Sequence, residues 1–119
     1  MKKILLIEDD PLLIDIYRTK LETAGFTVAI VNDGEKALEA VGLENPDAVL
    51  LDIVLPKVDG WEILKGIKEK DNKIKVIVLS NLGQKEEVEK GFNLGAEKYL
   101  IKANFTPSDV VAEIEKLFI

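Results

Sequence analysis

Residues 4–10 of the chain read Ile-Leu-Leu-Ile-Glu-Asp-Asp, four aliphatic residues followed at once by three carboxylates. The aliphatic run is short and does not alternate with polar residues, which is typical of a strand buried on both faces. Similar runs recur at residues 28–31, 48–51, 76–79 and 99–101. The longer segments between the runs place apolar residues at helical spacing. The chain therefore alternates strand and helix from end to end.

This alternation predicts a single α/β domain over residues 1–119, built on a doubly wound parallel sheet with helices on both faces. In such sheets, the ligand site lies beyond the carboxyl ends of the strands. The residues that directly follow the runs should therefore meet in space. They are Glu8, Asp9 and Asp10 after the first run, Asp52 after the third, Ser80 after the fourth and Lys102 after the fifth.

Three dipeptides mark expected helix starts. Asp10-Pro11 and Thr106-Pro107 each place a capping side chain before a proline, which fits the first helical position. Helix capping therefore explains Asp10 better than a metal does. Asp59-Gly60 is interpreted as a turn that starts the third helix, with glycine allowing an unusual backbone conformation.

Composition excludes several kinds of chemistry. The 119 residues contain no Cys and no His, so thiol nucleophiles, imidazole ligands and disulfides are absent. Twenty-two acidic and 16 basic residues give a net charge of −6, which argues against direct contact with nucleic acid. No apolar run approaches the roughly 20 residues of a membrane span. We expect a cytoplasmic protein without membrane attachment.

The converging carboxylates of Glu8, Asp9 and Asp52 would repel one another, and burying them unpaired would be costly. A hard divalent cation such as Mg²⁺, with Mn²⁺ as the alternative, resolves this repulsion. Three carboxylates and the Lys102 ammonium sum to −2, which one such ion neutralises. The same ion could bridge to a phosphoryl oxygen.

Asp52 is the candidate nucleophile, because a carboxylate that attacks phosphorus forms an aspartyl phosphate. Lys102 and the Ser80 hydroxyl could each contact a phosphoryl oxygen. Each residue also has an ordinary structural interpretation: Asp52 as a turn residue, Lys102 as a solvated side chain and Ser80 as a helix cap. Their convergence at one sheet edge favours the functional interpretation.

These residues belong to one longer pattern. It comprises residues 4–10, Asp52, Leu55-Pro56, Asp59-Gly60, Ser80 and residues 99–102. The pattern resembles the receiver domain of two-component response regulators over the whole chain. The resemblance implies a flavodoxin-like (βα)5 fold with strand order 2-1-3-4-5, and a signalling switch that assists its own phosphorylation rather than an enzyme. It also implies that Glu8 and Asp9 are the acidic pair for Mg²⁺, with Asp9 favoured as the direct ligand.

The resemblance further assigns roles around Asp52. Asp52 would accept a phosphoryl group from a phosphohistidine on a sensor histidine kinase or a histidine phosphotransfer protein. The backbone carbonyl of Val54 would complete the metal site, and Lys102 would contact the phosphoryl group. Ser80 would move towards that group and Tyr99 would turn inward, although an aromatic residue in a strand is more often simply core. The fourth helix, fifth strand and fifth helix would then bind a downstream effector or a second copy.

Three features depart from the family pattern or extend it. Ala103 replaces the usual proline after Lys102, yet we expect the Lys102–Ala103 peptide to remain cis so that the lysine points into the site. Val54 and the apolar Leu82 cannot orient a hydrolytic water, which predicts a long-lived aspartyl phosphate. Leu12 and Ile14 are interpreted as pointing off the buried face of the first helix, where the family docks the kinase; scattered exposed apolar residues are the alternative.

Three other functions remain as alternatives. A receiver that has lost phosphorylation and binds partners constitutively would not need the full acidic set. A haloacid-dehalogenase-like phosphatase has a second acidic residue two positions after the nucleophile, where this chain has Val54. A flavodoxin-like cofactor carrier needs a phosphate loop after the first strand, where three carboxylates would repel phosphate.

Overall fold

The computed structural model describes residues 2–119. Its strands are β1 (Lys3–Ile7), β2 (Thr27–Val31), β3 (Ala48–Leu51), β4 (Lys75–Ser80) and β5 (Lys98–Ile101). All neighbouring strands pair in parallel, and the sheet order is β2-β1-β3-β4-β5. The predicted doubly wound sheet is confirmed.

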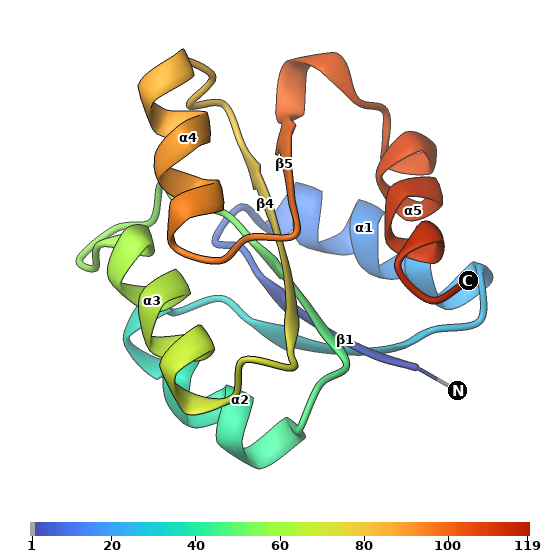
Figure 1. Ribbon diagram of the computed structural model, residues 1–119. Helices are drawn as coiled ribbons and strands as arrows, with labels where there is room; N and C mark the ends of the chain where they lie inside the picture. The colour runs from blue at the N-terminus through green and yellow to red at the C-terminus, as the bar shows by residue number, and fades with distance from the viewer. Residues whose placement is uncertain (1) are drawn as a thin grey trace.

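Helices follow the strands and cover both faces of the sheet (Figure 1). They are α1 (Pro11–Thr23), α2 (Ala37–Glu44), α3 (Gly60–Lys70), α4 (Lys85–Asn93) and α5 (Pro107–Lys116). Helices α1 and α5 lie on one side, while α2, α3 and α4 lie on the other. Across residues 2–119, no helix is both long enough and apolar enough to cross a membrane.

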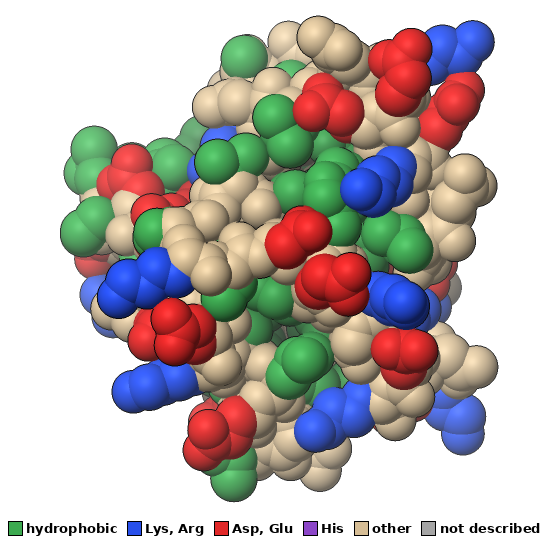
Figure 2. Space-filling view, turned by 90° about the vertical axis from the view of Figure 1, so that its left-hand side faces the viewer, with side chains coloured by type: hydrophobic (Ala, Val, Ile, Leu, Met, Phe, Trp, Pro, Cys, Tyr) green, Lys and Arg blue, Asp and Glu red, His purple; other side chains and the backbone are tan. Residues whose placement is uncertain are grey.

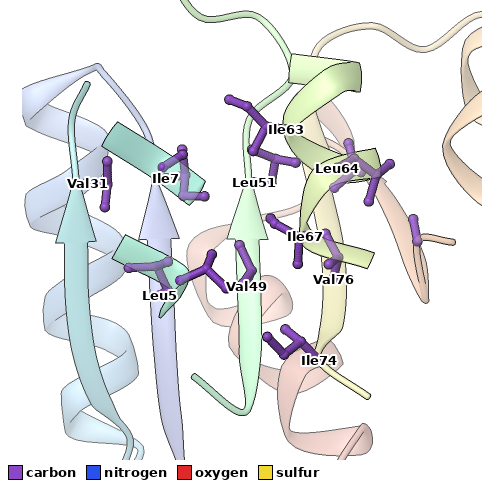
Figure 3. Packing of buried hydrophobic residues seen from close by; sticks show 14 of the residues in the cluster. Leu5, Ile7, Val31, Val49, Leu51, Ile63, Leu64, Ile67, Ile74 and Val76 are labelled. Atoms are coloured by element: carbon purple, nitrogen blue, oxygen red, sulfur yellow. The ribbon is translucent and has the colours of Figure 1, made fainter. Parts of the chain in front are cut away.

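Successive side chains of β1 point to opposite faces of the sheet, so this one strand contributes to two cores. Ile4 and Leu6 pack with residues of α1 and α5, whereas Leu5 and Ile7 pack with residues of α2 and α3. Figure 3 shows the second of these cores, where side chains of the strands meet those of α3. Because both faces are buried over residues 4–7, that part of the strand has no polar side chain, as its sequence indicates.

The expected helix starts are present. Asp10 caps α1 and Thr106 caps α5, each through its side-chain oxygen and with proline in the first turn. Asp59 caps α3 by accepting a hydrogen bond from the Trp61 N–H. The expected reason for Gly60 is wrong, because its φ is not positive. A Cβ there would lie 2.2 Å from the Ile53 carbonyl oxygen, so glycine is needed for close backbone approach.

Candidate functional site

Two buried carboxylates stand side by side where β1 and β3 end. The backbone pairing of Ile7 with Leu51 continues one residue further, where the Asp52 N–H donates to the Ile7 carbonyl. Glu8 and Asp52 are only 2% and 7% exposed. Burial of neighbouring carboxylates is unfavourable without a counter-charge, so this edge of the sheet requires a cation.

Lys102 supplies that counter-charge from the end of β5. It opens a short 3-10 turn, Lys102–Asn104, directly after the strand. Its Nζ donates to Glu8 Oε1 at 2.7 Å and to Asp52 Oδ2 at 2.8 Å. The predicted convergence of Glu8, Asp52 and Lys102 is therefore present in the structure.

The expected cis Lys102–Ala103 peptide is wrong, since no peptide bond among residues 2–119 is cis. A cis bond without proline costs about 2.5–4 kcal/mol. The 3-10 turn makes that cost unnecessary, because it already places the Lys102 ammonium between the two carboxylates with a trans bond.

Asp9 opens the acidic cluster to solvent. Its side chain is exposed, and carboxylate oxygens of Glu8, Asp9 and Asp52 all lie within 4.8 Å of one another. The Glu8 carboxylate also accepts the Asp9 N–H at 3.1 Å. Clustered oxygen ligands with one exposed side suit a hard cation that keeps part of its water shell. The residues present therefore fit a metal ion.

The pocket changes the ionisation of its buried groups. Burial raises the pKa of Glu8, and the nearby Asp52 carboxylate raises it further, while Lys102 opposes both. Burial alone would lower the pKa of Lys102, but its hydrogen bonds to Asp52 and Glu8 outweigh that effect and raise it. Lys102 is therefore firmly charged where it lies between the two carboxylates.

Ser80 and Tyr99 meet at Leu82. Ser80 is fully buried, and its Oγ accepts the Leu82 N–H at 3.3 Å. The Tyr99 hydroxyl donates to the Leu82 carbonyl at 2.5 Å, and burial, reinforced by Glu87 and Asp52, raises the pKa of Tyr99 to about 12. The alternative that Ser80 caps α4 does not hold, because Gln84 is the N-cap residue of that helix.

The remaining predicted residues differ in their exposure. The Val54 N–H donates to Asp52 Oδ1 at 2.9 Å, and its side chain is 55% exposed. Leu12 is 67% exposed, as its proposed contact with a partner would require. Ile14 is instead partly buried against the core shared by α1 and α5, so the expectation that it points away from the core is wrong.

Tyr17 is a residue near the site that sequence reasoning missed. Its spacing from Leu13 and Leu21 places it on the apolar stripe of α1, and it is only 3% exposed. It also lines a cavity of about 440 Å³ together with Lys102 and Asn81. Burial raises the pKa of the Tyr17 hydroxyl. A polar group within an otherwise apolar stripe was the available signal.

Comparison with known proteins gives a consistent result. A family model described as the response regulator receiver domain matches residues 4–115. Transcriptional regulatory protein QseB of Escherichia coli O157:H7 is 40% identical over 115 residues, which cover 97% of this chain and 52% of that protein. The alkaline phosphatase synthesis transcriptional regulatory protein PhoP of Bacillus subtilis is 32% identical, with 98% of this chain and 48% of the relative covered. The chain thus spans about half the length of these curated relatives.

Solved structures with the same fold include a CheY-like receiver domain from Methanospirillum hungatei. It has a TM-score of 0.92 at 27% identity, with 98% of this chain and 93% of that chain covered. The BeF3-activated receiver domain of DrrB, a Thermotoga maritima protein, gives a TM-score of 0.89 at 34% identity, with coverages of 99% and 97%.

Proposed function

The chain belongs to the response regulator receiver domain family, and we propose that residues 1–119 act as one phosphoacceptor domain whose acceptor is Asp52. Receiver domains of this family are signalling switches of two-component systems, and they interact with kinases and effectors. The observation that carries the proposal is the Lys102 ammonium held between Asp52 and Glu8, with Asp9 beside them.

In the proposed transfer, an Asp52 carboxylate oxygen attacks the phosphorus of a phosphohistidine on a histidine kinase or a phosphotransfer protein. A P–O bond forms while the P–N bond breaks, and the bonding electrons stay on the imidazole nitrogen. The Val54 N–H on Asp52 Oδ1 restrains the plane of the carboxylate. Lys102 already contacts Oδ2 at 2.8 Å, so its charge is within reach of a phosphoryl group formed on that carboxylate.

Glu8, Asp9 and Asp52, with the backbone carbonyl of Val54, would hold Mg²⁺ or alternatively Mn²⁺. When bound, such an ion supplies two positive charges near the transferring phosphoryl group. The support is the oxygen-only ligand set within 4.8 Å and its net charge of −2 together with Lys102.

The Leu82 peptide could transmit a conformational change from Asp52 to the protein surface. Among residues 2–119, the Ser80 hydroxyl accepts a hydrogen bond but donates none, so its proton is available to a phosphoryl oxygen. A Ser80 side chain that turns towards Asp52 would release the Leu82 N–H, and the Leu82 carbonyl is bonded to Tyr99. Phosphorylation would thereby alter the face formed by α4, β5 and α5, to which an effector or a second copy binds.

Leu12 provides the candidate kinase contact on α1. It lies in the first turn of the helix that follows the acidic cluster, and its side chain is largely exposed. Ile14 supports the helix from the core side. Replacing Leu12 with Ser should slow transfer from a kinase but leave transfer from a small phosphodonor unchanged.

The central test is phosphorylation measured by intact mass. The protein is incubated with Mg²⁺ and acetyl phosphate, and we expect a mass gain of one phosphoryl group. Asp52→Asn should abolish this gain, whereas Asp15→Asn, at an exposed position on α1, should keep it. A gain that persists in Asp52→Asn would overturn the assignment. Absence of any gain in the wild type would favour a constitutive binding module, and repeated release of phosphate would favour a phosphatase.

The lifetime of the phosphoryl group is a second proposal about this site. The exposed, apolar Val54 side chain cannot orient a water molecule for attack on the aspartyl phosphate. We expect Val54→Asn to shorten the lifetime by about tenfold, which corresponds to about 1.4 kcal/mol. The decay of the added mass after removal of acetyl phosphate measures it, and equal decay rates would contradict this role.

A further inference from the structure

The ring of Tyr99 is held between α3 and α4 by more than its hydroxyl. Trp61, in the first turn of α3, stacks on it with ring centroids 6.5 Å apart and an interplanar angle of 26°. Both rings are partly buried and pack against the core shared by α2 and α3. Stacked aromatic pairs contribute energy beyond their buried area. Trp61 is therefore one wall of a binding place for the Tyr99 ring.

Gly91 of α4 lies beside the same ring, close to both Tyr99 and Trp61. It is buried, and a Cβ on it would lie 2.7 Å from Tyr99 Cδ2 and 3.1 Å from Cε2. The same Cβ would lie 3.7 Å from Cζ3 of Trp61. No Cβ fits at 2.7 Å unless the ring moves, so the Tyr99 position depends on the missing side chain.

Lys90 covers the outer side of this arrangement. Its Nζ lies 4.9 Å from the centroid of the Trp61 ring, within the range of a cation–π interaction. The surface over α3 and α4 shows hydrophobic side chains interspersed with acidic and basic ones (Figure 2). Trp61 is thus fixed from outside as well as from the core.

The Tyr99 ring occupies this place while the acceptor site is in its unmodified form. Lys102 is bonded to the free carboxylate of Asp52, and Ser80 is bonded to Leu82. We propose that Trp61 and Gly91 are positioning residues that hold the Tyr99 ring inward before phosphorylation. The signalling role of this ring position rests on the proposed function. The ring position itself is a property of the unphosphorylated protein.

The consequence concerns which part of the switch moves. If the ring is already inward, phosphorylation acts mainly on Ser80 and the Leu82 peptide, and the Tyr99 side chain changes little. The unphosphorylated receiver would already have the Tyr99 ring in its inward position. Its α4 face would therefore be closer to the signalling conformation than in a receiver whose tyrosine rotates freely.

Proton NMR of the unphosphorylated protein tests the proposal. The chain has two tyrosines and one tryptophan, so Tyr17→Phe assigns the Tyr99 ring signals. We expect upfield-shifted Tyr99 ring protons with nuclear Overhauser contacts to Trp61. Gly91→Ala should abolish the contacts and the shift. Gly66→Ala is the matched control, because its Cβ would meet only the Leu38 side chain, at 2.9 Å.

Tyr99→Phe separates the two restraints on the ring. If Trp61 and Gly91 hold it, the ring contacts to Trp61 persist without the hydroxyl; their loss would overturn the proposal. Unshifted Tyr99 signals in the wild type, or unchanged ones in Gly91→Ala, would also overturn it.

If Gly91→Ala folds poorly, Trp61→Leu serves as the second variant. We expect it to increase averaging of the Tyr99 χ1 couplings, and unchanged couplings would overturn the proposal. Uptake of phosphoryl by mass in each variant, expected within about twofold of wild type, reports separately on the proposed function.

Discussion

Two glutamates of this protein are each bonded to lysine, yet their surroundings change their pKa values in opposite directions. Glu8 at the end of β1 is buried, and burial raises its pKa despite the bond to Lys102. Glu113 on α5 lies near the surface, bonded to Lys116 at 2.8 Å and to Lys98 at 2.7 Å. Those two hydrogen bonds lower the pKa of Glu113 to about 2.

The difference shows what each cluster contributes. At the surface, water solvates the charges, and two lysines surround one carboxylate, so the ionised form is favoured. In the acidic pocket, one lysine serves Glu8 and Asp52 together, and the charges remain unbalanced. The pocket therefore costs folding stability, whereas the surface cluster adds a little. Such costs are found at functional sites, where the surrounding structure offsets them.

Removing the shared lysine should have the largest effect. Lys102→Met leaves two buried carboxylates without a counter-charge and should reduce the free energy of unfolding by about 3–5 kcal/mol. Lys98→Met makes the same chemical change at the surface cluster and should cost at most about 1 kcal/mol. Urea unfolding at pH 7 measures both. Equal losses would remove the contrast between the two clusters.

Neutralising Glu8 should have a smaller effect of opposite sign. Glu8→Gln leaves Asp52 and Lys102 as a balanced pair, so we expect stabilisation by about 1 kcal/mol at neutral pH. Because burial raises the pKa of Glu8, this carboxyl favours folding while protonated, and that contribution is lost as pH rises through its folded-state pKa. The stabilisation by Glu8→Gln should therefore vanish when the pH falls below 4.5, the ordinary pKa of this carboxyl group.

Glu8→Gln should also weaken metal binding. Mg²⁺ should raise the unfolding temperature of the wild type more than that of Glu8→Gln, because a ligand stabilises the state that binds it. Destabilisation by Glu8→Gln at pH 7 would show that the pocket is not strained by excess charge.

The smallest effect is expected at Glu113. Glu113→Gln should lower stability by about 0.5–1 kcal/mol at pH 7, since ion pairs that water can reach are partly screened. The lowered pKa means that the contribution is present above the ordinary value of 4.5 and disappears as pH falls towards about 2. Urea unfolding of both proteins from pH 7 to pH 2 should therefore converge at the acid end. A difference that grows with acidity would contradict the assignment.

Most of the fold could be predicted from periodicity and capping chemistry. The aliphatic runs predicted the strands to within one residue at each end, because a strand buried on both faces holds apolar residues along its middle. Asp10 and Thr106 were identified as caps, since proline directly after them allows little else. The convergence of Glu8, Asp52 and Lys102 followed from the rule that parallel strands end at one edge.

Contacts between side chains of distant segments could not be predicted in this way. The direct bond between Lys102 and Glu8 joins residues 94 positions apart, and it depends on a 3-10 turn that no local signal marks. The stacking of Trp61 on Tyr99 likewise joins residues of α3 and β5 that are 38 positions apart in the chain. The expectation for Ile14 fails because Ile14 lies on the same apolar stripe of α1 as Tyr17 and Leu21, which is about 100° wide.

The two-residue period of β1 has a consequence for how this gene can vary. Ile4 and Leu6 contribute to one core and Leu5 and Ile7 to the other, and directly after the strand Glu8 is buried and Asp9 is exposed. Inserting or deleting one codon within residues 4–8 would exchange the two cores and turn the wrong carboxylate outward. Aliphatic substitutions in this strand can therefore keep both cores, whereas a change of its length cannot.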